Sequence, residues 1–549
     1  MTQALVQTDE LAAILKAARG AKQSLIVEAL AGTGKTTALL EIIKGLWESS
    51  ALVLAFNRRI ADEMQRRMPP IPRNRAVHVK TLHAAGLSIT AHHFPRVTTS
   101  KDITEERIRT AAGKGTPLRV LGASTKLLRF VKDYQHAREL DLDLAFKLGT
   151  EFGAFDKLSD IQESRRTVEI VGRAYTASLE VGDKIDFPDQ GWLPLVLDLA
   201  PPSRYKVILL DEYQDVNPNQ LEMVERLLAP NGRIIAAGDK NQAIYGWRGA
   251  STMATWDRLR DHYHAVSLPL TVTWRCDREI VDEAKKLVPG LKARPDAGPG
   301  GVHTIGEDEF LAGGITHFEG SAFVLSRTNA ALFRVALELW RRQIPYNITQ
   351  STDILGPLKG VLQKLLRSSE RVPQAMPKIP ALTDDDVEGT LQRFHLRRQW
   401  GEQQAAKVTA AETAKANVVA AMTFKQALAA WYMTEMMKAS AADSASWAER
   451  IEEQHLMLLF CLNFVGDPFG IEALLETIYA WDEMCWITLS TVHKVKGEEA
   501  DNVFLLQETF ARYRKSRDGK LPLTVPVEET NIEYVALTRA KRNLTWVTS

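Results

Sequence analysis

Residues 24–36 carry the stretch that decides the fold, SLIVEALAGTGKT. Its apolar first half has the length of a buried strand, and residues 38–47 (ALLEIIKGLW) continue it with a helical pattern. Between them, small residues let backbone amides surround phosphates, and the start of a helix favours negative charge. This arrangement predicts a P-loop in which Lys35 reaches the β- and γ-phosphates and the Thr36 hydroxyl ligates Mg²⁺. We expect nucleotide contacts at Ala29 (where the usual pattern has glycine), Gly32, Thr33, Gly34, Lys35, Thr36 and Thr37.

Further apolar runs extend this unit into a parallel sheet. ALVLAF (51–56), YKVILLDE (205–212) and GRIIAAGD (232–239) alternate with helical patterns, as in α/β proteins. A second α/β series begins near SLPLTVTWR (267–275). Strands of that series are expected at 321–329, 486–493, 502–506 and 544–547. The predicted fold class is α/β, with two parallel-sheet lobes that each contain a mainly helical insertion.

Long helical stretches set the expected domain boundaries. The segment between the second and third strand runs is mostly helical in character, for example STKLLRFVKDYQHAREL (124–140). The Ala-rich residues 401–422 suit either a helical domain or a flexible helical linker. We expect lobe 1A at 1–90 and 191–266, helical insertion 1B at 91–190, lobe 2A at 267–370 and 481–549, and helical insertion 2B at 371–480.

Charge and cysteine content exclude several classes of protein. The 549 residues carry 69 Lys and Arg against 68 Asp and Glu, a net charge of +1. A uniformly basic coat for nucleic acid is therefore absent, although a local basic groove is compatible with this balance. The three cysteines form no CxxC pair, so neither a disulfide framework nor a zinc site is indicated. Without a signal-peptide pattern or an apolar run near the ~20 residues that span a bilayer, we expect a soluble, cytoplasmic protein with no membrane partner.

Two acidic residues end the strand run at 205–212. Asp211 can hold Mg²⁺, usually through water, and Glu212 is placed to orient and deprotonate an attacking water. Adjacent side chains on a strand point to opposite faces, so the two acids need not share a role. An acidic cap at a strand end would explain the pair alone, but the P-loop upstream favours a nucleotide site.

A longer series of motifs resembles the superfamily 1A helicases typified by UvrD, Rep and PcrA. Order and approximate spacing match across nearly the whole chain, most weakly in the two insertions. The resemblance implies two RecA-like lobes that bind ATP and Mg²⁺ between them and act on single-stranded DNA. The matching segments are 29–36, 56–64, 81–83, 211–215, 238–250, 270–275, 324–329, 489–501 and 528–541.

The resemblance implies roles for further residues around the nucleotide. Gln242 resembles the residue that senses the γ-phosphate, and Glu499 matches a nucleotide-contacting acid. Arg275 and Arg539 match two arginines of the second lobe, which can stabilise transition-state charge when the cleft between the lobes is shut. The expected catalytic residues are Lys35, Glu212, Gln242, Arg275 and Arg539.

Three departures from the family pattern stand out. Trp274 replaces the usual tyrosine, and its indole can still stack on adenine. Glu498 stands where the family often has an apolar residue. Gln7 is the candidate for the adenine-reading glutamine, but its spacing to Lys35 is long and Leu11 occupies a competing alignment.

The strand-binding surface is expected to combine stacking with phosphate contacts. Aromatic faces hold single-stranded DNA at about 1–3 kcal/mol per base, without sequence preference. Trp247 matches the family's stacking platform, in the segment that links the ATP state to DNA. The DNA-binding residues implied by the resemblance are Phe56, Thr81, His83, Tyr245, Trp247, Arg248, Arg327, Asn329, Thr491 and His493.

The resemblance implies an ATP-driven motor that moves 3′→5′ on single-stranded DNA and separates strands. Its expected substrates are single-stranded DNA and 3′-tailed or forked duplexes, and a replication or repair protein is a candidate partner. Two alternatives stay open. One is a translocase that displaces DNA-bound proteins or drives a partner, with weak unwinding alone, and the other is an ATP-gated DNA-binding subunit.

Overall fold

The computed structural model describes residues 8–20, 22–155, 158, 160–244, 252–349, 352–369, 424–437, 445–468, 470–477, 485–513 and 524–548. Contacts divide the chain into two compact units. Unit 1 comprises Met1–His303, Lys496–Glu499 and Lys515–Leu544. Unit 2 comprises Thr304–Val495, Ala500–Arg514 and Thr545–Ser549.

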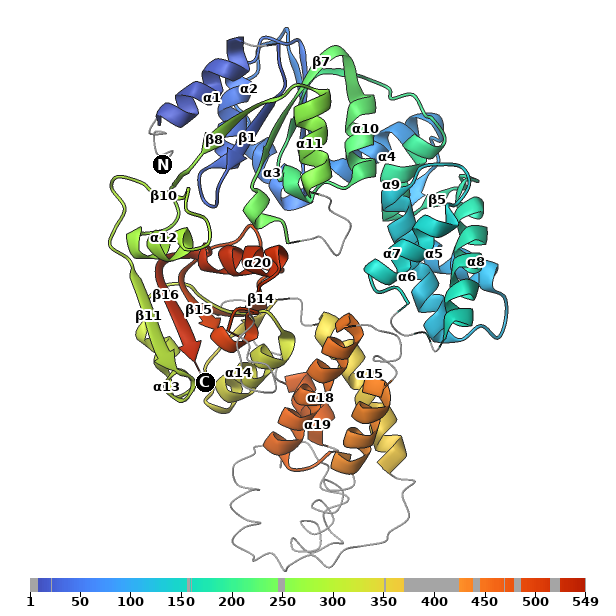
Figure 1. Ribbon diagram of the computed structural model, residues 1–549, viewed down its shortest axis with the longest axis vertical. Coiled ribbons are helices and arrows are strands. Elements are labelled where there is room, and N and C mark those ends of the chain that lie inside the picture. The colour runs from blue at the N-terminus through green and yellow to red at the C-terminus, as the bar shows by residue number, and fades with distance from the viewer. Residues whose placement is uncertain are drawn as a thin grey trace, which may run out of the picture. The chain divides into compact units, whose positions relative to one another are not determined.

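A six-stranded parallel sheet forms the centre of unit 1 (Figure 1). Its order is β3-β2-β6-β7-β1-β8, and each neighbouring pair of strands runs parallel. Parallel pairing brings the carboxyl ends of the strands to one edge, where ligands bind in such sheets. The strands are β1 (Leu25–Ala29), β2 (Ser50–Ala55), β3 (Ala76–Thr81), β6 (Tyr205–Leu210), β7 (Leu228–Gly238) and β8 (Val266–Leu270).

Helices cover both faces of this sheet, which explains why its strands β1, β2 and β6 are nearly continuous apolar runs. Val27 of β1 packs in one core and its neighbour Ile26 packs in the other, since adjacent side chains point to opposite faces. The first core is closed by α1 (Asp9–Gly20), α2 (Lys35–Gly45) and α3 (Arg58–Arg66). The second is closed by α4 (Leu82–His93), α10 (Pro218–Leu227) and α11 (Thr252–His262).

A helical segment with its own core lies between β3 and β6. Its core draws on α5 to α9, and a short parallel pair joins β4 (Thr98–Thr99) to β5 (Lys184–Ile185). The helices are α5 (Ile103–Ala112), α6 (Leu118–Tyr134), α7 (Leu142–Glu151), α8 (Ile161–Ser178) and α9 (Phe187–Val196).

A buried ionic cluster ties three of these helices together. Lys132 Nζ of α6 lies 2.5 Å from Asp189 Oδ1 of α9, and both side chains are 0% exposed. Arg107 Nη1 of α5 lies 2.5 Å from the other carboxylate oxygen of Asp189. Burial alone would raise the pKa of Asp189, but the two cations outweigh it and lower that pKa. Each charge therefore depends on the others for its solvation.

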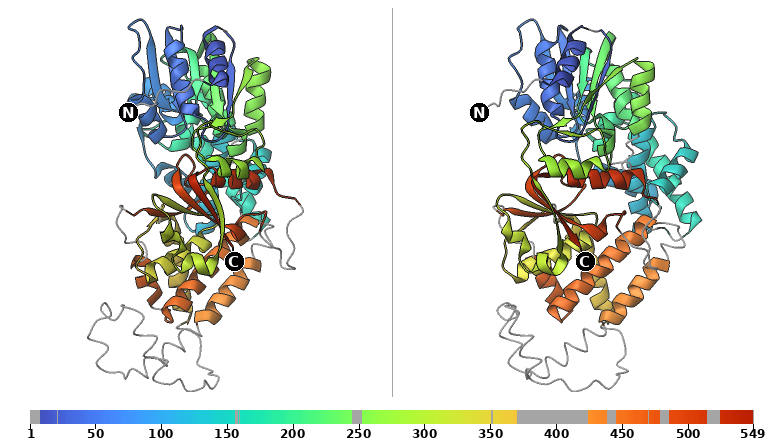
Figure 2. Two further views of the ribbon diagram at one scale, coloured as in Figure 1. Left: turned by 90° about the vertical axis from the view of Figure 1, so that its left-hand side faces the viewer. Right: turned by 60° about the vertical axis from the view of Figure 1, so that its left-hand side comes forward.

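Most of a second six-stranded sheet lies in unit 2, in the order β11-β16-β15-β12-β14-β13 (Figure 2). Strand β12 pairs in parallel with both β14 and β15, and β13 pairs in parallel with β14. Apolar side chains of α14 (Asn329–Arg341), α15 (Thr352–Ser369), α18 (Ala445–Val465), α19 (Gly470–Thr477) and the helical residues 424–437 share its core. The strands are β11 (Gly301–Gly306), β12 (Ala322–Ser326), β13 (Asn347–Ile348), β14 (Ile487–Thr491), β15 (Ala500–Leu506) and β16 (Ala540–Thr548).

The predicted α/β class with two sheets of parallel strands is confirmed. One strand differs from expectation, because 266–270 is the edge strand of the first sheet, paired with β1, rather than the start of the second series. An apolar run after a helix has the same local pattern in either sheet, so the sequence does not assign it. Contacts also group 267–303 and 515–544 with unit 1. The domain boundaries as a whole stay a prediction, and much of 371–480 lies outside the described residues.

Replacing Asp189 tests the ionic cluster. Asp189→Ala should lower the free energy of unfolding by about 3–5 kcal/mol, because two cations are left buried without their carboxylate. The matched control is Glu63→Ala, which removes the exposed pair with Arg67 on α3 and should cost no more than about 0.5 kcal/mol. Urea unfolding followed by circular dichroism measures both. Equal losses would show that the cluster is not what holds the helices.

Candidate functional site

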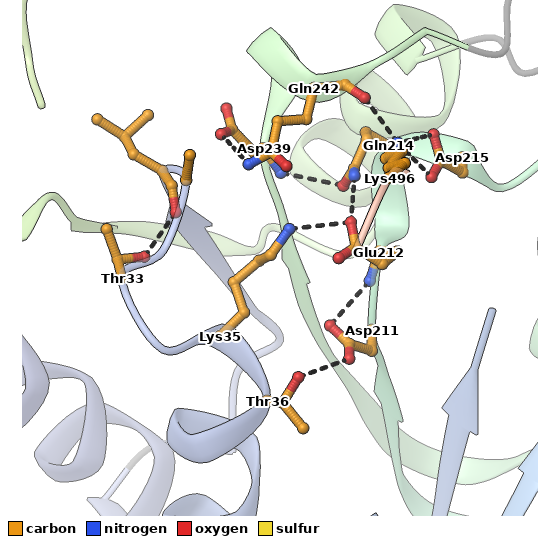
Figure 3. A network of polar contacts seen from close by, with 12 residues as sticks. Thr33, Lys35, Thr36, Asp211, Glu212, Gln214, Asp215, Asp239, Gln242 and Lys496 are labelled. Carbon is orange, nitrogen blue, oxygen red and sulfur yellow. Dashed lines mark hydrogen bonds and ion pairs between the residues drawn. The ribbon is translucent and has the colours of Figure 1, made fainter. Parts of the chain in front are cut away.

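The loop between β1 and α2 has the backbone of a phosphate cradle. Gly32 and Gly34 have φ values of +70° and +87°, in the left-handed region that glycine enters freely. Helix α2 begins directly after Gly34 without a side-chain cap, which leaves the amides of its first turn to another acceptor. The Thr33 hydroxyl turns back and donates to the Leu30 carbonyl at 2.8 Å (Figure 3). The loop therefore fits a phosphate through its backbone.

Lys35 and Thr36, at the start of α2, contact the two acids that follow β6. Lys35 Nζ lies 2.9 Å from Glu212 Oε2, and Thr36 Oγ1 donates to Asp211 Oδ2 at 3.1 Å (Figure 3). Glu212 has φ of 52°, a left-handed conformation that is uncommon for a residue with a side chain. This turn directs the two adjacent carboxylates to different partners. Strain of this kind concentrates at functional sites.

Burial and neighbouring charges set the protonation of this group. Burial alone would lower the pKa of Lys35, but Glu212, Asp211 and Asp239 outweigh it and raise that pKa. Burial would raise the pKa of Glu212, yet Lys35 and Lys496 hold it at about 2. Burial and the charge of Glu212 raise the pKa of Asp211 to about 6. At neutral pH, Lys35 is therefore a cation and Glu212 a carboxylate.

Asp211 and Thr36 present oxygen ligands, which suit Mg²⁺. Within the part of the chain that the structure describes, no group of three or more His, Cys, Asp or Glu side chains could hold a metal ion. The two residues fit a Mg²⁺ ion that takes its remaining ligands from phosphate and water, as this ion usually does.

A second layer of polar residues supports Glu212. The Gln214 amide donates to the Glu212 carboxylate, and the Asp239 backbone amide donates to Gln214 Oε1 at 3.0 Å. Gln242 Nε2 in turn donates to Asp239 Oδ2 at 2.6 Å. This chain of contacts connects the predicted γ-phosphate sensor to the predicted base (Figure 3).

Lys496 joins the same network from a distant part of the sequence. Its Nζ lies 2.6 Å from Asp215 Oδ2 and donates to the Gln242 carbonyl, also at 2.6 Å. Gln214, Asp215 and Lys496 lie inside the matching segments 211–215 and 489–501, but they were not among the predicted site residues. Lys496 could have been predicted from its charge, because it is opposite to that of Asp215 and both residues lie in motifs that border the P-loop site.

Arg275 lies against the phosphate loop. A Cβ added at Gly32 would stand 2.7 Å from Arg275 Cβ, so only glycine fits there. Arg275 Nε lies 2.6 Å from Glu499 Oε2, and its Nη1 donates to the Thr538 carbonyl at 2.9 Å. Trp274 is half-buried beside it, and its backbone amide donates to the Gly32 carbonyl at 2.8 Å.

Arg539 is 1% exposed and is held mainly by backbone carbonyls. Its Nε donates to the Val535 carbonyl at 2.9 Å and its Nη1 donates to the Glu498 carbonyl at 3.0 Å. Burial, with a further contribution from Arg275, lowers the pKa of Arg539 to about 9, which still leaves it charged at neutral pH. A buried cation without a carboxylate of its own suits an anion that arrives later.

The other residues expected near the nucleotide, and one that was not expected, have different surroundings. Gln7 lies outside the described residues, and Leu11 is buried in the core beneath α1. Tyr534 was not selected from the sequence, yet its hydroxyl accepts a hydrogen bond from the Ala31 amide of the phosphate loop at 3.1 Å. Thr37, at the start of α2, accepts from Arg67 Nη2 at 2.8 Å.

Unit 1 also contains a groove of about 1330 Å³. Three of the predicted DNA-binding residues line it, namely Phe56, Thr81 and His83. Thr81 also caps α4 by accepting from the Ala84 amide, and burial lowers the pKa of His83. Five basic side chains (Arg58, Lys80, Arg109, Lys126 and Arg129) and four acidic ones (Asp62, Glu105, Asp133 and Asp215) share the lining.

Phe187 is an aromatic residue of this groove that the sequence analysis missed. It is the first residue of α9 and is 55% exposed, although it is large and apolar. Its ring lies 5.0 Å from the His83 ring, tilted by 59°. Phe187 stands between the helix cap Asp186 and Pro188, and this local pattern does not reveal its exposure, so the sequence alone offered no signal for it.

The remaining predicted DNA contacts separate into two groups. Arg327, Asn329, Thr491 and His493 follow or end β12 and β14, whose parallel pairing aligns Ser326 with Thr491. They therefore gather at one edge of the second sheet. Asn329, at the start of α14, donates from its backbone to Glu453 Oε1 at 2.7 Å. Tyr245, Trp247 and Arg248 lie outside the described residues.

Comparisons with known proteins agree with this geometry. Residues 11–263 match the UvrD/REP helicase N-terminal domain and residues 477–549 match the UvrD-like helicase C-terminal domain, together more than half of the chain. F-box DNA helicase protein 1 of Schizosaccharomyces pombe is 26% identical over 98% of this chain and 57% of its own length. The ATP-dependent DNA helicase PcrA of Leuconostoc citreum is 26% identical over 48% of this chain and 37% of its own length. This chain thus spans less than two thirds of either relative.

Two further matches are more distant. A probable DNA helicase II homolog of Mycoplasma pneumoniae is 22% identical over 94% of this chain and 81% of its own length. A solved complex of Arterivirus nonstructural protein 10 (helicase) with DNA is 12% identical, with a TM-score of 0.31, over 97% of this chain and 62% of that one. That likeness is too weak for a comparison of structures.

Among the described residues, no helix has both the length and the apolar character to cross a bilayer.

The two domain matches follow the order of the motifs, and the phosphate loop, the acids after β6 and Arg539 all fall inside them. The chain belongs to the UvrD/Rep/PcrA-like family of superfamily 1 helicases.

Proposed function

We propose that this chain is an ATP-driven motor that moves along single-stranded DNA and separates strands with 3′→5′ polarity. The observation that carries the proposal is that one short loop serves both the nucleotide site and the groove. Asp215 of this loop holds Lys496 in the nucleotide network and also lines the groove. A change at the nucleotide therefore acts on a residue that faces the nucleic acid.

The phosphate loop and its neighbours account for nucleotide binding. The amides at the start of α2 and Lys35 bind the phosphates, while Thr36 and Asp211 hold Mg²⁺. When bound, Mg²⁺ neutralises phosphate charge. Trp274 offers an indole face for adenine on the side of the loop formed by Gly32.

Lys35 controls how basic Glu212 is. With Lys35 at 2.9 Å, the pKa of Glu212 is held at about 2, which makes the carboxylate a weak base. When Lys35 turns to the phosphates, Glu212 loses its nearest cation and its pKa rises. Glu212, still oriented by Gln214, can then accept a proton from the attacking water. Binding of the nucleotide thus activates the base.

Arg275 and Arg539 supply positive charge for the transition state. Arg275 lies against the phosphate loop, and Arg539 is a buried cation held by carbonyls. Arginines in this role are worth on the order of 10³–10⁵ in rate where measured. Gln242 can report the state of the γ-phosphate to Lys496 through its carbonyl contact.

The groove suits a single strand. Phe56 and Phe187 offer aromatic faces for bases, and the basic lining residues can contact phosphates. Thr81 and His83 stand at the same wall, where a neutral imidazole with a lowered pKa donates or accepts a hydrogen bond. Trp247 is proposed as a further stacking platform on the basis of the family resemblance alone.

The decisive test is unwinding of duplexes with 3′ tails, 5′ tails and blunt ends. The proposal expects ATP-dependent strand separation on 3′-tailed and forked duplexes and little on the other two. Preference for 5′ tails would contradict the polarity. Translocation on single strands without unwinding would favour the translocase that displaces bound proteins, and ATP-dependent binding without turnover would favour the ATP-gated subunit.

Lys35→Ala should abolish ATP hydrolysis and leave measurable DNA binding, because the groove lies outside the phosphate loop. Phosphate release measures the first and fluorescence anisotropy measures the second. The matched control is Lys44→Ala on the same helix, where the exposed ammonium pairs with Glu41 and turnover should be unchanged. Normal turnover in Lys35→Ala would remove the P-loop assignment.

Phe187→Ala should weaken binding of single-stranded DNA roughly 5- to 150-fold, the loss of one stacked base. The control is Trp47→Ala, which removes an exposed aromatic side chain that does not line the groove. Anisotropy with a fluorescent oligonucleotide compares the two. Equal effects would show that Phe187 does not contact the strand.

A further inference from the structure

Four residues of the chain have an unusual place in the fold. Lys496–Glu499 belongs to unit 1, whereas the residues before it, to Val495, and after it, from Ala500, belong to unit 2. The chain therefore leaves unit 2 after β14, contributes this segment to unit 1, and re-enters unit 2 at β15.

Both ends of the segment contact nucleotide-site residues. Lys496 Nζ lies 2.6 Å from Asp215 Oδ2. Glu499 Oε2 lies 2.6 Å from Arg275 Nε, and its other oxygen lies 2.9 Å from Lys541 Nζ. The segment thus connects the acidic loop after β6 to the arginine beside the phosphate loop.

Arg59 of helix α3 contacts the middle of the segment. Arg59 Nη1 lies 2.8 Å from Glu498 Oε1, and Arg59 Nη2 donates to the Gly497 carbonyl at 3.3 Å. The two side chains are 58% and 38% exposed. Glu498 is also the position at which this chain departs from the apolar residue common in the family.

The backbone carbonyl of Glu498 makes a separate contact, with Arg539. Its carbonyl accepts a hydrogen bond from Arg539 Nη1 at 3.0 Å, and Arg539 is otherwise held by its own helix end. Whatever fixes Glu498 therefore also fixes the guanidinium of Arg539. Helix α3 begins two residues after Phe56, so the helix that carries Arg59 lies at the edge of the groove.

We propose that Arg59 and Glu498 form a positioning pair that orients Arg539 and Glu499 for ATP hydrolysis. The pair rests on the proposed function, since it acts on the arginines assigned to that reaction. In the part of the chain that the structure describes, Arg59 contacts Glu498 and the Gly497 carbonyl rather than the phosphate loop, so the pair acts through the segment 496–499.

Physical arguments separate this role from a stabilising one. An exposed ion pair contributes little to stability, because water and salt screen it. Orientation has a much larger effect on rate, since a displacement of about 1 Å in a catalytic group can cost up to 10²-fold. Loss of the pair should therefore lower turnover and leave unfolding almost unchanged.

A charge swap in the full chain tests the pair. Arg59→Glu, Glu498→Arg and the double variant are compared by steady-state ATP hydrolysis without DNA, so that changes in DNA affinity do not enter. Each single variant should lower kcat roughly 10-fold with little change in KM, and the double variant should recover most of the loss. High salt should reduce the difference between wild type and the single variants.

The matched control is Arg66→Glu, which makes the same charge change on α3 at a residue whose side chain donates to the Asp62 carbonyl of its own helix. It should leave kcat unchanged, and thermal unfolding should be alike for all variants. Single variants with normal kcat, or a double variant no better than the singles, would overturn the pair while the proposed function stands. A wild-type chain that hydrolyses no ATP would overturn the proposed function and the pair's role together.

Discussion

The buried contact between Lys35 and Glu212 is the constraint on which the rest of the site depends. Removing two charges from water is costly, and their mutual attraction compensates only when further polar groups complete their solvation. Asp211 and Asp239 supply this for Lys35, and Gln214 with Lys496 supplies it for Glu212. The pair therefore requires β1, β6, β7 and the segment 496–499 to meet at one edge of the sheet. A phosphate that draws Lys35 away would remove its ion pair with Glu212, which would make the arrangement sensitive to nucleotide.

The acidic loop after β6 carries that sensitivity toward the groove. Beyond Asp215, Asn217 caps α10 and donates through Nδ2 to Asp133 of α6 at 3.1 Å. Asn219 donates to the Lys132 carbonyl at 2.8 Å, near the same end of α6. Helix α6 forms part of the groove wall and contains Lys132 of the buried ionic cluster. Close-packed elements joined by buried polar contacts tend to move together rather than deform, so in the proposed mechanism a shift of this loop would displace the wall of the groove.

How far the sequence could predict the structure depends on how local each signal is. The phosphate loop, β6 and its acids were predicted because strand, glycines and charges lie within a few residues of one another. The apolar run of β8 was recognised but assigned to the wrong sheet, because its pairing with β1 is decided by contacts that no local pattern encodes. The Arg59–Glu498 pair joins residues 439 positions apart, and Phe187 is recognisable only once its exposure is known. Family resemblance brought Arg539 to the site, but its carbonyl partners required the fold.

The near-neutral charge of the chain now has a structural counterpart. The groove is lined by five basic and four acidic side chains, so it offers no strong net attraction for a polyanion. Binding that relied on phosphate contacts alone would release many counterions and would be hard to reverse at low salt. In the proposed function, stacking on Phe56 and Phe187 would hold the strand with limited strength and without sequence preference. The proposed motor must release and rebind its strand in each cycle, and a groove of mixed charge with aromatic faces would keep both steps accessible.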